Sequence, residues 1–283
     1  MNTHAPGTVR FVGAGPGDPS LLTVRADALL RSASVLLHDD LVAPEILALA
    51  PSDALVLNVG KRCGAKRISQ PEINALMVSF ARRGFDPIRL KSGDPAIFGR
   101  LGEEIDALSA AGIQFEIVPG VSAGLAAAAS LGISLTDRRL SSRVVFATAH
   151  HARTPGESQA NDWRGLAGED TTLVVYMPGH DLTALQKELL DAGLADDTPA
   201  VVVSRATTPA QSEHSTTLAA LATAPVLEAP SILLIGRTVA PGRVESSSEP
   251  VAAASASDWE DFLDLLPLEP IADRVSSSSR RLG

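Results

Sequence analysis

Short apolar runs alternate with segments of helical periodicity over the first 120 residues of the chain. The apolar runs predict buried strands at 9–12, 34–38, 56–59, 87–90 and 115–118. Between them, apolar residues recur every three to four positions, which predicts helices at 21–30, 72–80 and 103–111. An alternation of strands and helices is typical of a mainly parallel sheet with helices on both faces, so an α/β fold is expected.

A second block of the same kind follows near residue 141. Apolar runs predict strands at 144–148, 172–176, 200–203 and 231–235, with a helix at 182–192, the start of a short helix at 217–221, and a polar loop at 150–168. The linker is expected at 136–142, where Asp137, Arg138 and Arg139 interrupt the apolar pattern. The chain therefore divides into an N-terminal α/β domain at 1–140 with glycine-rich loops and a C-terminal α/β domain at 141–240.

The composition changes beyond residue 240. Serine runs at 246–248 and 276–279 predict a disordered tail at 241–283. Within the tail, Trp259 and Phe262 stand with leucines among acidic residues, which favours a short amphipathic helix. Docking of that helix on its own domain and binding of a partner both remain open.

Composition and charge restrict the class of protein. Hydrophobic residues make up 45% and charged residues 20% of the 283, which is typical of a folded chain. The net charge of −9 is the opposite of the positive charge typical of nucleic-acid-binding proteins, although a local basic cleft is compatible with it. A single cysteine, Cys63, excludes an internal disulfide framework and a multi-cysteine metal site. With no signal-peptide pattern and no apolar stretch long enough to span a bilayer, we expect a cytoplasmic protein that binds no membrane.

Three turns that contain glycine follow predicted strands, at 13–19, 89–100 and 118–123. The first is not a dinucleotide-binding fingerprint, because Asp18 stands where that pattern requires a third glycine, and no Gly-Lys-Ser/Thr follows to make a P-loop. Any one such turn can be purely structural. Loops at the carboxyl ends of strands in one open sheet can converge on a single crevice, so together the three turns predict a ligand site.

These turns carry a resemblance to a known family. The segments GAGPGDP at 13–19, GKR at 60–62, QPEIN at 70–74, GDPAIFGR at 93–100 and PG at 119–120 resemble the tetrapyrrole methylase family, over about residues 9–239. The resemblance implies two α/β domains with the active site in the cleft between them, S-adenosyl-L-methionine as methyl donor, and a homodimer. It also implies methylation of uroporphyrinogen III at C2 and C7 to precorrin-2, for sirohaem or cobalamin, with no nucleic-acid or membrane partner.

The resemblance also implies roles for individual residues. Asp39 matches the catalytic aspartate and Lys61 the proton donor, although from the residues alone Asp39 can be a turn or helix-cap residue and Lys61 a solvated charge. The positions matching the cofactor site are Pro16, Ser92, Gly93, Asp94, Ile97, Ser122, Ala123, Met177 and Ala206. From the residues alone, Asp94 can instead cap a turn ahead of Pro95, and Met177 can fill a hydrophobic core.

The substrate of such an enzyme carries eight carboxylates, so its site needs cations. Arg62 and Arg100 are the candidates we assign to the substrate. Other basic residues that could contribute are Lys66, Arg67, Arg138 and Arg139.

The chain departs from the family pattern at three places. It reads His38-Asp39-Asp40 where a tyrosine commonly precedes the aspartate and a basic residue often follows it, so that Asp40 makes the site more acidic. Ser92 and Ala206 stand where glycine is frequent. Three alternative functions remain. The first is a methylase that acts on a later precorrin, and the second is a nicotinamide-dependent oxidoreductase, which Asp18 disfavours. The third is a ligand sensor without catalytic activity.

Overall fold

The computed structural model describes residues 5–60, 68–149 and 162–240. Its first sheet has five parallel strands in the order β3-β2-β4-β1-β5. They are β1 (Val9–Gly13), β2 (Val35–His38), β3 (Leu55–Asn58), β4 (Ile88–Lys91) and β5 (Phe115–Val118). All five lie within a residue or so of the runs predicted from the sequence. The expected parallel sheet is therefore confirmed, with β4 at its centre.

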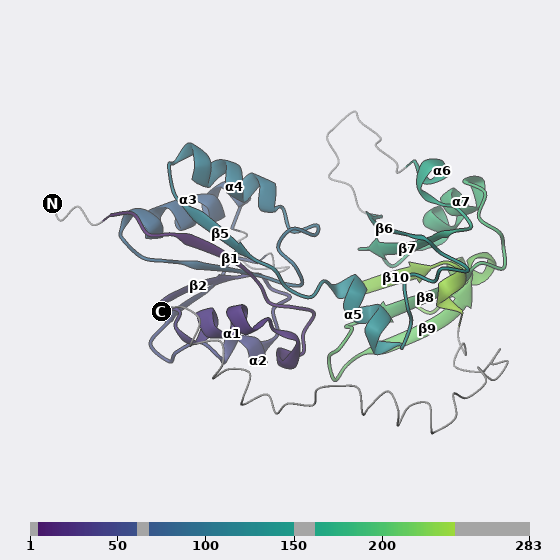
Figure 1. The fold of residues 1–283 in the computed structure, drawn as a ribbon, viewed down its shortest axis with the longest axis horizontal. Coiled ribbons are helices and arrows are strands. Elements are labelled where there is room, and N and C mark those ends of the chain that lie inside the picture. The colour runs from purple at the N-terminus through teal and green to yellow at the C-terminus, as the bar shows by residue number, and fades with distance from the viewer. Residues whose placement is uncertain (1–4, 61–67, 150–161, 241–283) are drawn as a thin grey trace, which may run out of the picture. The chain divides into compact units, whose positions relative to one another are not determined.

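Helices cover both faces of this sheet (Figure 1). On one face lie α1 (Val24–Arg31) and the short α2 (Pro44–Leu47); on the other lie α3 (Gln70–Arg82) and α4 (Leu101–Ala110). The 3-10 turn η1 (Pro19–Leu21) precedes α1. Local sequence fixes where two of them begin. The hydroxyl of Thr23 accepts from Ala26 N (3.2 Å) at α1, and Ser69 and Glu72 form a capping box at α3.

The second sheet is mixed, in the order β6-β7-β10-β8-β9. Its strands are β6 (Arg143–Thr148), β7 (Thr171–Tyr176), β8 (Pro199–Ser204), β9 (Ser212–Thr217) and β10 (Ser231–Ile235). Strands β6 and β7 are parallel, and the remaining neighbours pair antiparallel. The four predicted strands are present, and β9 is an addition that the apolar pattern did not predict.

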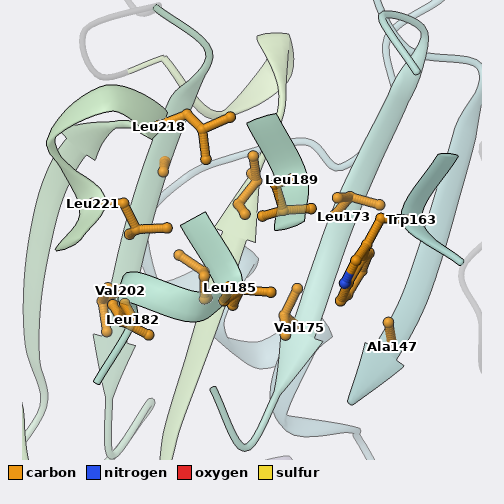
Figure 2. Packing of buried hydrophobic residues seen from close by; sticks show 13 residues of the cluster. Ala147, Trp163, Leu173, Val175, Leu182, Leu185, Leu189, Val202, Leu218 and Leu221 are labelled. Atoms are coloured by element: carbon orange, nitrogen blue, oxygen red, sulfur yellow. The ribbon is translucent and has the colours of Figure 1, made fainter. Parts of the chain in front are cut away.

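The second sheet also buries both faces. One face packs against α6 (Trp163–Leu166), α7 (Thr183–Asp191) and η2 (Leu218–Thr223), and Figure 2 shows the leucines of α7 and η2 with Trp163 in that core. The other face packs against α5 (Ala123–Ser130) and η3 (Arg237–Val239). Helix α5 precedes the linker expected at 136–142, yet its alanines pack on this second sheet. Gly124 illustrates how closely it packs, because a Cβ there would lie 2.7 Å from the Tyr176 hydroxyl.

Within the described part of the chain, none of the helices has the length and apolar character needed to cross a membrane. The tail expected to be disordered, at 241–283, lies outside the described residues.

Candidate active site

The turns that follow β1, β4 and β5 contact one another. Gly15 and Gly93 exchange backbone hydrogen bonds of 3.1 and 2.8 Å, and the Asp94 carboxylate accepts from Gly120 N at 3.0 Å. A Cβ on Gly13 would lie 2.6 Å from the Gly120 backbone and 2.8 Å from the Gly93 carbonyl oxygen. Glycine is needed here because the three turns approach more closely than any side chain permits. The three turns are thus brought together at the carboxyl end of the first sheet.

Loops of the second sheet contact the same turns. Tyr176, the last residue of β7, places its hydroxyl 2.6 Å from Ser122 Oγ and accepts from Gly124 N at 3.0 Å. Its ring centroid lies 4.9 Å from that of Phe98. After β8, Thr208 lies so close to Gly17 that a Cβ on Gly17 would be 2.6 Å from the threonine methyl. Loops after five strands, three from one sheet and two from the other, therefore meet.

Backbone strain is concentrated in these loops. Among the described residues, non-glycine side chains with positive φ occur at five positions, all after β4, β7 or β8: Phe98, Arg100, Met177, Arg205 and Thr207. Such conformations cost free energy and persist where the surroundings impose them, most often at functional sites. Thr207 also has a buried hydroxyl without a hydrogen-bond partner among the described residues.

The residues predicted to bind the cofactor lie in these five loops. Pro16 follows β1, Ser122 and Ala123 begin α5, Met177 follows β7, Ala206 follows β8, and Ser92, Gly93, Asp94 and Ile97 follow β4. Asp94 has the turn-capping role that its sequence context suggested, since Oδ1 accepts from Ala96 N at 2.8 Å. Met177 is 47% exposed, which shows that it is not core filler.

Asp39 follows β2 at the same edge of the first sheet. Arg89 Nη2 donates to Asp39 Oδ1 at 2.5 Å, and Lys91 Nζ lies 4.0 Å from Oδ2. The residue does not cap a helix, because the cap position of α2 is Ala43. Its carboxylate is therefore oriented by two cations of the neighbouring strand β4.

The neighbours of Asp39 differ from the family pattern without disturbing that arrangement. His38 is buried, and its Nδ1 lies 3.0 Å from the Asp39 carbonyl oxygen, so this hydrogen bond requires a proton on Nδ1. Asp40 accepts from Asn58 Nδ2 at 2.8 Å. The extra carboxylate is thereby engaged at the end of β3.

The structure describes only some of the basic residues that were predicted to bind the substrate. Lys61, Arg62, Lys66 and Arg67 lie outside the described residues. Arg100 is the N-cap residue before α4 and donates to Glu103 at 2.7 and 2.6 Å, with 46% of its side chain exposed. Arg139 pairs with Asp137, and Arg138 is exposed. Of the three that the structure describes, Arg100 alone sits in one of the five converging loops.

Sequence reasoning assigned no role to a set of buried charges beneath Asp39. Arg89, Lys91 and Glu104 are each at most 3% exposed. Burial and the neighbouring Arg89 lower the pKa of Lys91, and Glu104 and Asp39 offset part of that shift. Arg89, a cation within a strand predicted to be buried, was the signal that could have pointed to this cluster, since a buried charge requires a partner.

Comparison with known proteins gives a consistent family. Residues 8–222 match the family described as Tetrapyrrole (Corrin/Porphyrin) Methylases. The chain is 44% identical over 237 residues to the chloroplastic S-adenosyl-L-methionine-dependent uroporphyrinogen III methyltransferase of Arabidopsis thaliana, covering 83% of this chain and 64% of the relative. It is 42% identical to the uroporphyrinogen-III C-methyltransferase of Paracoccus denitrificans, covering 83% and 82%. It spans about half the length of the siroheme synthases that it matches, such as siroheme synthase 2 of Aeromonas hydrophila (43% identity; 83% and 49%).

Solved structures agree. The uroporphyrin-III C-methyl transferase of Thermus thermophilus, complexed with S-adenyl homocysteine, superposes with a TM-score of 0.71 at 37% identity, covering 82% of this chain and 93% of that one. The cobalt precorrin-4 methyltransferase CbiF superposes with a TM-score of 0.73 at 32% identity, covering 83% and 96%.

Proposed function

Because the chain belongs to the family of tetrapyrrole (corrin/porphyrin) methylases, we propose that it methylates uroporphyrinogen III at C2 and C7, giving precorrin-2. S-adenosyl-L-methionine is the methyl donor, in sirohaem or cobalamin biosynthesis. The observation that carries the proposal is the meeting of five loops from two sheets, which brings together the nine residues predicted to bind the cofactor. The names of the relatives and the S-adenyl homocysteine bound by the Thermus protein support it.

The converging loops are suited to the methyl donor. Close packing at Gly13, Gly93 and Gly120 holds the three turns of the first sheet together, and the unpartnered Thr207 hydroxyl can bond a polar ligand atom. When bound, S-adenosyl-L-methionine supplies a methyl group on a positively charged sulfur to an electron-rich pyrrole carbon. The main task of the protein is then to hold donor and acceptor in line.

Asp39 is proposed to accept the proton that leaves the methylated ring. Its side chain is 30% exposed, whereas the cations that orient it are buried, so the carboxylate can reach a substrate without moving its partners. Lys61 is proposed as the proton donor. Arg62 and Arg100 are proposed to bind substrate carboxylates, and Arg100 would exchange its bond to Glu103 for one to the substrate.

The wider organisation is also proposed. Each sheet with its helices would form a domain, with the site in the cleft between them, and the protein would act as a cytoplasmic homodimer. The family resemblance supports the dimer, and the single cysteine is compatible with a reducing compartment. Sedimentation of the purified protein tests the dimer.

The test of the function is incubation with labelled S-adenosyl-L-methionine and enzymatically generated uroporphyrinogen III, followed by mass analysis. Two added methyl groups are expected. An Asp39→Asn protein should turn over roughly 100-fold more slowly or worse, with little change in the donor's Kd. The likeness to CbiF makes a later precorrin the second candidate substrate. Methylation of that substrate with none of uroporphyrinogen III would replace the proposal, and failure to bind S-adenosyl-L-methionine would reject both.

A further inference from the structure

Four charged side chains form a chain of contacts that ends at Asp39. Glu104 Oε1 accepts from Arg89 Nε at 3.0 Å, and Glu104 Oε2 accepts from Lys91 Nζ at 3.0 Å. Both cations also face the Asp39 carboxylate, Arg89 at 2.5 Å and Lys91 at 4.0 Å. Glu104 and Asp39 therefore share the same two cations.

The fold places these groups together from three elements. Arg89 and Lys91 are two residues apart on β4, so their side chains point to the same face of the sheet. That face is covered by α4, which carries Glu104, and by α3, whose Gln70 donates to Glu104 Oε1 at 3.2 Å. Asp39 follows β2, which is paired with β4, and its N donates to the Leu90 carbonyl at 3.3 Å.

The four charged side chains differ in how far they are exposed to solvent. The side chain of Glu104 is fully buried and those of Arg89 and Lys91 are 3% exposed, whereas that of Asp39 is 30% exposed. A guanidinium is planar, so a carboxylate that fixes Nε also fixes where Nη2 points. The orientation of Glu104 is in this way transmitted to the one member of the cluster that a substrate can reach.

Stability does not explain why these residues are charged. A buried ion cluster adds little over a well-packed apolar core, because desolvation offsets the attraction between the charges. Loss of a single member is different, since it leaves an uncompensated charge in the interior.

We propose that Glu104 is a positioning residue for methyl transfer, which holds Arg89 and Lys91 in place and through them orients the Asp39 carboxylate. The inference rests on the function proposed above for Asp39. Glu104 itself touches neither substrate nor donor in this account, so its removal should affect turnover and leave binding of S-adenosyl-L-methionine intact.

The test compares Glu104→Gln with Asp106→Asn, which neutralises an exposed carboxylate on the same helix. In Glu104→Gln we expect kcat to fall by roughly 100-fold, as for a catalytic group displaced by about 1 Å, while the Kd of the donor stays within about twofold. Asp106→Asn should match the wild type in both. If Glu104→Gln does not fold, Arg89→Lys replaces it, because lysine keeps the charge but lacks the planar guanidinium. The same fall in kcat with little change in the Kd of the donor is expected.

A second readout does not depend on catalysis. Titration of the Lys91 ammonium followed by nitrogen NMR should show a lower pKa in Glu104→Gln than in the wild type, because Glu104 favours the charged form of Lys91. The Arg89 Nε–H signal should also exchange faster with water. The groups that face Lys91 are Asp39, Arg89 and Glu104, so these changes report on this cluster.

The outcomes separate the two proposals. Three results for the Glu104→Gln protein would each overturn the positioning role. The first is a wild-type kcat, and the second is an unchanged Lys91 titration. The third is a loss of donor affinity as large, in fold-change, as the loss of kcat, together with a lower melting temperature. If the wild-type protein forms no methylated product, the proposed function fails and the role in methyl transfer fails with it. The Lys91 titration then still decides whether Glu104 is coupled to the cations.

Discussion

The hydroxyl of Tyr176 lies 2.6 Å from Ser122 Oγ and joins the end of β7 in the second sheet to the turn that follows β5 in the first. The same hydroxyl accepts from Gly124 N at 3.0 Å. Burial raises the pKa of Tyr176, so the group stays protonated and can donate to Ser122 while it accepts from Gly124. One phenol thus connects the two sheets at the start of α5, where Ser122 and Ala123 are proposed to contact the methyl donor.

Removing that hydroxyl is expected to weaken both the fold and the site. Tyr176→Phe leaves the buried Gly124 N–H unpaired, which costs about 1–3 kcal/mol of unfolding free energy, and it should raise the donor's Kd. Urea unfolding and calorimetric titration measure the two effects. Ser122→Ala and the double variant complete a cycle, and purely additive effects would show that the two side chains do not cooperate.

The close approach of the glycine turns gives a steric prediction. A Cβ at Gly120 would collide with the backbone of Gly13 and Gly93, so Gly120→Ala should cost about 1–3 kcal/mol of stability and weaken donor binding. Gly102 is the matched control, because it lies on α4 with an ordinary helical φ, and a Cβ added there would have no neighbouring atom within 4 Å. Gly102→Ala should be neutral or slightly stabilising. Equal behaviour of the two variants in thermal melts and titrations would contradict the crowding argument.

Arg100 should matter for the tetrapyrrole and not for the methyl donor. It is half exposed and pairs with Glu103, and replacing it by Ala removes a charge-assisted bond to a substrate carboxylate. We expect KM for uroporphyrinogen III to rise roughly 10-fold, with the donor's Kd unchanged. Arg143→Ala is the control, since Arg143 is also exposed and paired, with Asp170, at the start of β6. Equal weakening of both ligands in Arg100→Ala would remove the assignment.

How far the sequence reveals the fold depends on burial. Strands such as β2, with all four residues buried, produce apolar runs that are visible without a structure. Strand β9, SEHSTT, lies at the edge of its sheet and has no buried residue, so its pairing with β8 comes from the fold and not from its own hydrophobicity. Helix α5 is apolar all round, and no periodicity tells which sheet such a helix covers.

The sequence likewise reveals only part of the site. The glycine turns were recognisable because few residue types allow such backbone approach, as at Gly13. The partners of Asp39 were not, because Glu104 lies 65 positions further along the chain and reaches the cluster only when α4 packs over β4. Lys91, which stands beside a loop in the sequence, is in fact 2% exposed.

The depressed pKa of Lys91 predicts a pH dependence of stability. Burial disfavours the charged ammonium in the folded protein, so the folded-state pKa lies below the unfolded value of 10.5. Below the folded pKa the charge must be buried, and above 10.5 neither state carries it. The unfolding free energy of the wild type should therefore rise relative to that of Lys91→Met as pH increases through this window, and the gain should be lost as pH falls through the folded pKa. Urea unfolding of both proteins between about pH 7 and about 10.5 measures the difference, in which the titration of other groups largely cancels. A difference that is constant with pH would mean that Lys91 titrates as it does in the unfolded chain, and that the surrounding carboxylates fully compensate its burial.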